Sequence, residues 1–370
     1  MHITRLKLSF FRNILDAELE FAPQNNLICG PNGAGKTNIL EALFYLGVAR
    51  SFRTNLDDNM VNTDSEFFRL EADGRIPPHE VNMEIAVKPG KRKTIKVNSS
   101  PLKRLGQLFE YFRLVEFSPY DIEIINGAPA NRRKFLSLTI AQSEPQHISV
   151  LTEYYKILAQ RNALLKSYQA ERQLSSAQEA TLEAWDERLA QTAVIIHNAR
   201  RRFVNEIAEL AAGFYRRISG PSESLSMEYD FSPKIEEYSQ ANLCAKWASR
   251  RQRELSMAQT LYGPHRDDLK FIINGLEARP SGSQGQVKTA VLGLKLAQYE
   301  YLKKCLGQTP IMLLDEIFSD FDTNRLEYII RLLPQLGQTF ITTSKLSEIR
   351  DLRIFDCKYQ IEKGIPSHMK

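Results

Sequence analysis

Gly30-Pro31-Asn32-Gly33-Ala34-Gly35-Lys36-Thr37 is the stretch that decides the fold of this 370-residue chain. Its glycines let successive backbone N–H groups point at phosphate oxygens, where larger side chains would block the approach. Lys36 would neutralise charge on the β- and γ-phosphates, and the Thr37 hydroxyl would complete the coordination of Mg²⁺. An apolar strand, Leu27-Ile28-Cys29, precedes this phosphate loop, and apolar residues at helical spacing follow it over residues 39–46. Residues 30–37 are therefore predicted to bind ATP with Mg²⁺.

A second apolar strand, Ile311-Met312-Leu313-Leu314, ends in two carboxylates. Ligands of a buried parallel sheet collect at the carboxyl ends of its strands. Asp315 is predicted to hold Mg²⁺ together with Thr37, and Glu316 to orient or deprotonate the water that attacks the γ-phosphate. Lys36 and Glu316 are thus the predicted catalytic residues. Acids at strand ends also cap helices, but the phosphate loop favours the catalytic interpretation.

Ser283-Gln284-Gly285-Gln286 has the S-x-G-Q form of the ABC-type signature and precedes a helical pattern over residues 287–296. A small hydroxyl and a glycine at a helix N-terminus form a second cradle for anions. In ABC-type ATPases this cradle grips the γ-phosphate held by another subunit. Ser283, Gly285 and Gln286 are therefore predicted to contact nucleotide, with a simple helix cap as the alternative.

The rest of the chain predicts an α/β fold interrupted by helices. Alternating apolar residues over 6–21 indicate antiparallel strands, and the pattern strand, helix, strand over 310–343 indicates a parallel unit. Residues 146–212 contain neither Gly nor Pro, and polar residues 167–181 would turn one long helix back on another. A seven-residue repeat runs along the second helix through Leu182, Leu189, Ile196, Phe203 and Leu210.

We therefore expect an ABC-type P-loop ATPase head, with a mixed sheet and antiparallel N-terminal strands, into which a helical hairpin arm is inserted. The predicted division is 1–140 for the first part of the head, 141–220 for the arm, and 221–370 for the second part of the head. This last part would carry the signature, the acidic strand end and the D-loop.

The amino-acid composition limits the class of protein, its partners and its compartment. An apolar content of 43% suffices for a large core, and a net charge of +5 suits an anionic partner such as nucleic acid without requiring one. The four cysteines form no C-x-x-C pair, so neither a zinc site nor a disulfide framework is predicted. Neither a signal peptide nor an apolar run long enough to span a membrane is found. We expect a cytoplasmic protein without a membrane partner.

With these motifs, the sequence resembles the RecF family, which comprises recombination and repair ATPases of the ABC/SMC group. The matching stretches follow the order of the family and span nearly the whole chain: LKLSFFRN at 6–13, GPNGAGKTNILEALFYLGVARSFR at 30–53, FSPYDIEIINGAPANRRKF at 117–135, QRNALL at 160–165, GPHRDDL at 263–269, SQGQ at 283–286, and LLDEIFSDFD at 313–322.

The resemblance implies a weak, DNA-stimulated ATPase of DNA repair, replication and the SOS response. It implies an ATP-dependent homodimer in which Ser283 of one subunit meets the γ-phosphate bound at Lys36 of the other, with residues 319–322 as the D-loop across the interface. It further implies binding to single-stranded or gapped DNA and to junctions of single and double strands. Cooperation with RecR and RecO in loading RecA at stalled or gapped replication sites is also implied.

The chain departs from the pattern at four places, one of which is Leu136-Ser137 where Leu-Asp is expected. Glu316 stands where many relatives have Asp, and residues 342–345 offer no switch histidine after the last strand. No Q-loop glutamine is recognised, and residues 115–119 are the nearest candidate region. His265, in GPHRDDL, is predicted to have a structural hydrogen-bonding role.

Basic clusters occur at residues 91–96, 132–134, 200–202 and 250–253. Each is either a solvated face or a contact to DNA phosphates, and no base-reading motif accompanies them. Two other functions share the ATP motifs: the ATPase subunit of a membrane transporter and a short SMC-like structural protein. The long interval between Lys36 and Ser283 argues against a transporter, and the shortness of the predicted arm argues against an SMC protein.

Overall fold

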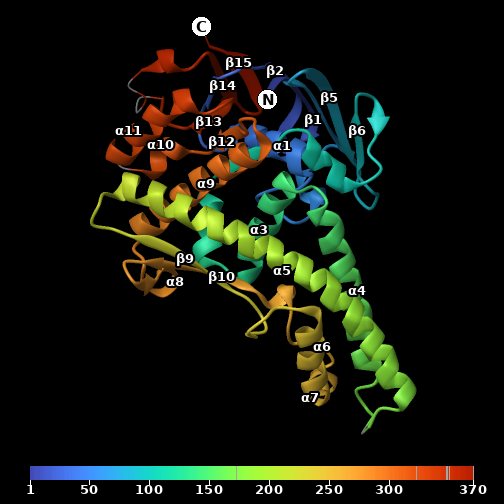
Figure 1. Ribbon diagram of the computed structural model, residues 1–370. Coiled ribbons are helices and arrows are strands. Elements are labelled where there is room, and N and C mark those ends of the chain that lie inside the picture. Colours follow the sequence, from blue (N-terminus) through green and yellow to red (C-terminus); the bar gives the residue numbers. More distant parts are fainter. Residues whose placement is uncertain (172, 322, 347–348, 350, 370) are drawn as a thin grey trace.

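The computed structural model describes residues 1–171, 173–321, 323–346, 349 and 351–369, and it shows a head with one long helical arm (Figure 1). Both termini lie on the side of the head away from the tip of the arm. Among the described residues, no helix combines the length and the apolarity needed to cross a membrane.

An antiparallel sheet of six strands, in the order β2-β1-β4-β5-β6-β7, forms one side of the head. Its strands are β1 (His2–Phe11), β2 (Ile14–Glu20), β4 (Phe68–Ile76), β5 (His79–Val87), β6 (Thr94–Val97) and β7 (Ser100–Pro101). The predicted antiparallel start of the chain is confirmed, with Leu6 paired to Leu19 and Leu8 paired to Ala17. Buried residues alternate along β1 and β2, as expected for strands with one face on a core.

A second sheet has the order β15-β14-β3-β13-β12-β8 and is parallel except for β15. Its strands are β3 (Asn25–Cys29), β8 (Leu114–Phe117), β12 (Ile311–Leu314), β13 (Thr339–Thr343), β14 (Cys357–Glu362) and β15 (Ile365–His368). Strands β3, β12 and β13 are buried throughout. The strand before the phosphate loop and the acidic strand are thus both in this sheet, separated by β13.

Helix α1 (Lys36–Val48) begins at the phosphate loop and lies in the apolar core between the two sheets. The other helices of the head are α2 (Glu123–Asn126), α3 (Pro129–Ser143), α8 (Ala278–Ser281), α9 (Gln284–Leu306), α10 (Ile317–Asp320) and α11 (Thr323–Leu332). Helix α9 shares a second core with α3, with β8 and β12, and with a small sheet of β9 (Leu225–Asp230), β10 (Asp268–Ile273) and β11 (Leu276–Glu277). The predicted fold class, an α/β ATPase head with an inserted helical arm, is confirmed.

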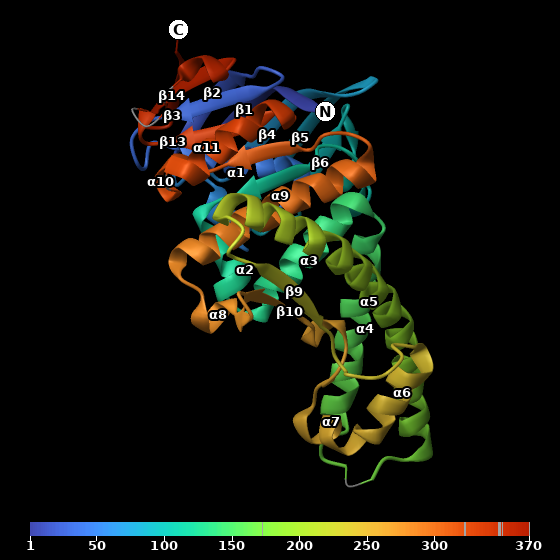
Figure 2. The same cartoon turned by 60° about the vertical axis from the view of Figure 1, so that its left-hand side comes forward.

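The arm consists of α4 (His147–Ser167) and α5 (Ser176–Ser219), which project from the head together (Figure 2). Four members of the predicted repeat on α5, Leu182, Leu189, Ile196 and Phe203, are buried. The predicted turn was too long, because α5 begins at Ser176 rather than after Thr181. The Ser175 side chain accepts a hydrogen bond from the Gln178 N–H, and the Gln178 side-chain oxygen accepts one from the Ser175 N–H.

Chain segments beyond residue 220 also build the arm. Helices α6 (Gln240–Ser249) and α7 (Arg251–Met257) pack against α4 and α5, and Trp247 is fully buried among apolar residues of both. A buried ion network closes this region: Arg161 of α4 contacts Asp186 of α5 and Glu254 of α7, each at 2.6 Å. The division of the chain at 140 and 220 stays a prediction.

Residues 263–268 connect the arm to the head. Asp267 contacts Arg200 of α5 at 2.9 Å, and Asp268 contacts Arg132 of α3 at 2.5 Å. His265 Nε2 donates a hydrogen bond to the Thr260 carbonyl at 3.1 Å, and in the neutral ring Nδ1 accepts one from the Tyr154 hydroxyl at 2.6 Å. These contacts agree with the structural role predicted for His265.

His265 should make the fold sensitive to acid. Burial lowers the pKa of His265 to about 4, so the folded protein favours the neutral ring. The corresponding stability is present above the unfolded pKa of about 6.5 and is lost as pH falls towards 4; at pH 5 the loss is about 2 kcal/mol. Between pH 7.5 and pH 5, the unfolding free energy of His265→Gln should therefore fall by about 2 kcal/mol less than that of the wild type. Urea unfolding at the two pH values measures this difference. The matched control is His79→Gln, at an exposed position; equal pH dependence of both variants would contradict the prediction.

Candidate nucleotide site

The phosphate loop joins β3 to α1 and is held tightly against the sheet. Gly30 has a φ of 151°, and a Cβ placed there would lie 2.2 Å from the Ile361 carbonyl oxygen of β14. Only glycine fits this approach of two backbones. The loop is also tied to the hairpin of β14 and β15, because the Gly364 N–H donates to the Ala34 carbonyl at 2.8 Å. The loop's shape is thus set before any ligand binds.

Lys36 is the buried cation of the site, with 4% of its surface exposed. Its Nζ donates to the carbonyls of Gly30 at 2.9 Å and Pro31 at 3.1 Å, and it lies 2.8 Å from Glu316 Oε1. The ammonium is therefore fixed in the mouth of the loop, where phosphate oxygens would replace or join these acceptors.

Thr37 and Asp315 lie together at the carboxyl ends of β3 and β12. The Thr37 hydroxyl donates to the Asp315 carboxylate at 3.0 Å, and Thr342 of β13 donates to the same carboxylate at 2.7 Å. Burial raises the pKa of Asp315 to about 6. One hydroxyl and one carboxylate suit Mg²⁺, which keeps several waters and takes its remaining ligands from phosphates. Consistent with that sparse donor set, the described residues contain no cluster of three or more metal-binding side chains.

Glu316 has a left-handed backbone conformation, with φ 50°. This unusual conformation directs its carboxylate towards two partners: Lys36 on one side, and the Ser344 backbone and hydroxyl on the other, at 2.9 and 3.1 Å. The Glu316 N–H donates to Thr342 at 2.9 Å. The carboxylate is thus placed beside Lys36, where the predicted role in orienting water requires it.

Several residues that support the loop are not among those predicted for the nucleotide site. Asn13 donates to the carbonyls of Gly33 and Ala34 at 3.3 Å each, and it accepts from Asn38 at 2.6 Å. Arg12 and Arg53 both contact the buried carboxylate of Glu41 on α1, at 2.6 and 3.2 Å. These residues belong to the stretches 6–13 and 30–53, so the family motifs contained them without showing their contacts.

The signature segment, residues 283–286, lies at the N-terminus of α9. The exposed Ser283 accepts a hydrogen bond from the Gln286 N–H at 3.2 Å, while the Gln286 side chain accepts one from the Ser283 N–H at 3.1 Å. The helix cap considered as an alternative is therefore present. In the described part of the chain, no hydrogen bond or ion pair joins Ser283, Gly285 or Gln286 to the phosphate loop of the same chain.

The basic clusters divide into buried and exposed residues. Arg132 and Arg200 are 3% and 0% exposed and pair with Asp268 and Asp267, so they hold the fold together and are not free to contact DNA. Arg201, Arg202, Arg250, Arg253, Lys91 and Arg92 are exposed. Within the predicted D-loop, Asp322 lies outside the described residues, as do the side chains of Ser319 and Asp320.

The fold and the site together define an ABC-type ATPase head. Its two sheets carry a phosphate loop and an acidic strand end, and the signature segment begins one of its helices. The model of the RecF/RecN/SMC N terminal domain matches residues 2–356. The chain belongs to the RecF family of DNA replication and repair proteins.

Relatives and solved structures agree on this family. The DNA replication and repair protein RecF of Acetivibrio thermocellus is 37% identical over 372 residues, which cover 98% of this chain and 99% of the relative. The RecF protein of Listeria monocytogenes is 37% identical over 371 residues, with the same coverage. A solved structure of the recombination mediator protein RecF with ATP, from the RecFOR pathway, has a TM-score of 0.92 at 34% identity and covers 100% of this chain and 98% of its own.

A more distant structure shows the fold alone. The Smc head domain of Pyrococcus furiosus, bound to the C-terminal domain of ScpA, has a TM-score of 0.56 at 16% identity and covers 100% of this chain and 96% of its own. The family model and the RecF relatives confirm the resemblance to the RecF family drawn from the sequence motifs.

Proposed function

We propose that this chain is an ATP-dependent DNA-binding protein of recombinational repair and replication. It binds ATP and Mg²⁺ at the phosphate loop, dimerises when ATP is bound, and hydrolyses ATP weakly, with stimulation by DNA. The single observation that carries the proposal is the division of the ATP motifs. Residues 30–37, Asp315 and Glu316 form one cluster, whereas the exposed Ser283 is at a helix end without a described bond to it.

The residues of the cluster have distinct proposed roles. The phosphate loop orients the triphosphate through its backbone N–H groups, and Lys36 neutralises phosphate charge. Thr37 and Asp315 would hold Mg²⁺, which neutralises further charge on the phosphates when bound. Glu316 orients the attacking water and accepts its proton. Ser283, Gly285 and Gln286 of a second head complete the site, so the bound nucleotide joins two copies.

Membership in the RecF family supports a proposed cellular role. We propose that the ATP dimer holds single-stranded or gapped DNA in the cytoplasm and, with RecR and RecO, helps to load RecA, which supports SOS induction. The relative solved with ATP is described as a recombination mediator of the RecFOR pathway. Because no base-reading motif accompanies the exposed arginines and lysines, binding would follow charge and DNA shape.

Sedimentation with gapped duplex DNA, with and without ATP, tests the DNA part of the proposal. We expect a complex that requires ATP and weakens steeply with salt, because phosphate contacts release counterions. With six neutralised phosphates, affinity would fall about a thousandfold between roughly 50 and 200 mM salt. The control is an intact duplex of equal length. Absence of any DNA complex at low salt would exclude the proposal and favour the transporter ATPase.

A further inference from the structure

A buried ion cluster lies between the signature helix and the edge of the parallel sheet, and none of its members takes part in the roles assigned above. Lys295 of α9 lies 2.6 Å from Asp121 Oδ1 and 3.4 Å from Glu116 Oε2. All three are buried, with 5%, 8% and 4% of their surfaces exposed. An ammonium and two carboxylates have thus been removed from water together.

The cluster connects the two halves of the proposed ATP machinery. Glu116 is on β8, paired in register with Leu313 of the acidic strand β12. One residue further, the Phe117 carbonyl accepts the Asp315 N–H at 2.8 Å. Lys295 is on the helix that begins at Ser283, twelve residues or roughly 18 Å along its axis. A single side chain therefore links the helix that carries Ser283 to the strand that lies beside Asp315.

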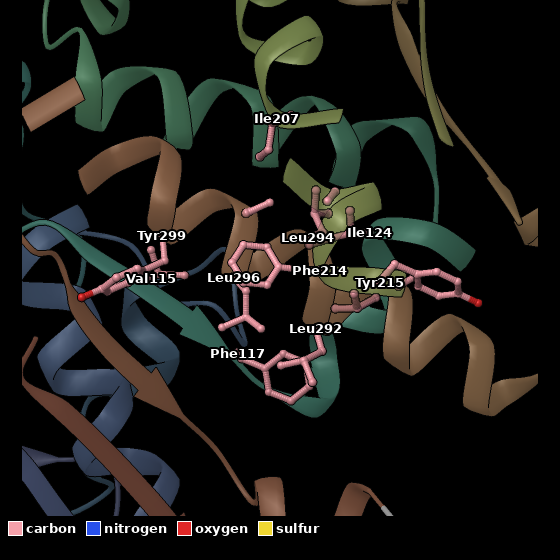
Figure 3. Packing of buried hydrophobic residues seen from close by; sticks show 14 of the residues in the cluster. Val115, Phe117, Ile124, Ile207, Phe214, Tyr215, Leu292, Leu294, Leu296 and Tyr299 are labelled. Carbon is pink, nitrogen blue, oxygen red and sulfur yellow. The ribbon is translucent and has the colours of Figure 1, made fainter. Parts of the chain in front are cut away.

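Apolar packing alone does not fix this helix along its axis. Figure 3 shows Leu292, Leu294 and Leu296 of α9 among Val115 and Phe117 of β8 and aromatic residues of α5. Such contacts are not directional, and a helix surface offers alternative packings. The short contact between Lys295 and Asp121 is a charge-assisted hydrogen bond and is therefore directional. It acts beside other polar contacts of α9, such as the Gln298 amide that donates to the Thr139 hydroxyl of α3 at 3.0 Å.

A gain in folding stability does not by itself explain why these three charged side chains are buried. Burying ions is costly, and well-packed apolar residues often replace a buried ion pair without loss of stability. The cluster is also incompletely satisfied: among the described residues, Glu116 Oε1 and Ser118 Oγ are buried without a hydrogen-bond partner. Two other charged groups, Lys134 of α3 and Asp315 at the end of β12, interact electrostatically with members of the cluster.

We propose that Lys295 is a positioning residue, which fixes α9, and with it Ser283, relative to the Mg²⁺ end of the nucleotide site. Through Asp121 and Glu116 it sets the orientation in which Ser283 is presented to the nucleotide on a second head. The inference rests on the proposed function, because it assigns to Ser283 a role in ATP-dependent dimerisation.

The test compares two affinities in Lys295→Met. Binding of ATP to the monomer, measured by calorimetry at low protein concentration, should stay within about twofold of the wild type, whereas the dissociation constant of the ATP dimer, measured by sedimentation velocity, should rise roughly tenfold or more. A general structural defect would change both affinities. The matched control is Lys304→Met on the same helix, where an exposed lysine pairs with Glu206 at 2.9 Å; it should dimerise normally.

A second variant covers the case in which Lys295→Met does not fold. Glu116→Gln, Asp121→Asn and Lys295→Met together leave no buried charge unpaired, and the same weakened dimer is expected. A folded variant of either kind that dimerises like the wild type overturns the inference. Ser283→Arg, measured in parallel, distinguishes failure of the proposed function from failure of the inference about Lys295. If Ser283→Arg forms a normal ATP dimer, the proposed function is contradicted. If Ser283→Arg loses the dimer but the Lys295 variants dimerise normally, only the inference is contradicted.

Discussion

Lys36→Arg should abolish ATP-induced dimers while leaving the fold intact. The Lys36 ammonium is enclosed by the carbonyls of Gly30 and Pro31 and by Glu316, all within 3.1 Å. A guanidinium is larger and planar, and its fork does not fit the place of a compact ammonium. Since hydrogen bonds between charged groups contribute about 1.5–3 kcal/mol each, ATP affinity should fall roughly 10- to 100-fold.

The measurement is sedimentation velocity with and without ATP, together with circular dichroism to check the fold. Lys363→Arg is the matched control, because this exposed lysine lies next to Gly364, which bonds the loop from outside. The control should dimerise normally. Wild-type dimers in Lys36→Arg would rule out the assignment of residues 30–37 as the ATP site.

Ser283→Arg should separate ATP binding from dimerisation. The site around Lys36, Thr37 and Asp315 contains no described contact with Ser283, so a single chain should bind ATP normally. An arginine at the N-terminus of α9 would fill the space that a γ-phosphate from a second chain needs, and it would remove the helix cap. Steric exclusion of this kind should weaken the dimer at least about 100-fold.

Calorimetry for ATP and sedimentation for the dimer give the two values. Because loss of the cap alone costs about 1 kcal/mol of stability, Ser283→Ala serves as the control for that part, and its thermal stability should fall as far as that of Ser283→Arg. A normal ATP dimer in Ser283→Arg would show that the signature segment acts only as a cap in its own chain.

Much of the fold was predictable because local patterns agree with the tertiary structure. The phosphate loop lies between the predicted strand and helix, and the acidic strand and its parallel partner pair as expected. The predicted alternation of buried and exposed residues over 6–21 was wrong at the turn between the first two strands. Phe10 has a φ of 55°, which shifts the buried positions to Phe11 and Ile14 and leaves Leu15 54% exposed. A backbone twist of this kind has no counterpart in a hydrophobic pattern.

The candidate site was predictable only where its residues belong to contiguous motifs. Lys36, Thr37, Asp315 and Glu316 come together as the motifs require, although their chemical roles stay predictions. The support from Asn13, Thr342 and Ser344 depends on strands that pair across most of the chain, and neither composition nor spacing records such contacts. For the same reason, runs of basic residues did not distinguish the buried Arg132 and Arg200 from the half-buried Arg133 or from the exposed Arg201 and Arg202.

Because α5 is one unbroken helix, a small rotation where it packs on the head would produce a larger displacement at the tip of the arm. The helix has 44 residues, and at 1.5 Å per residue it is roughly 66 Å long. Its last turns cross α9 so closely that a Cβ on Gly293 would lie 3.2 Å from the Tyr215 nitrogen. The far end of the helix, at Ser176, lies 39 residues or roughly 58 Å from that crossing, so a tilt of about 5° there would move it by roughly 5 Å. Small adjustments of α9 would thus become large displacements at the tip of the arm.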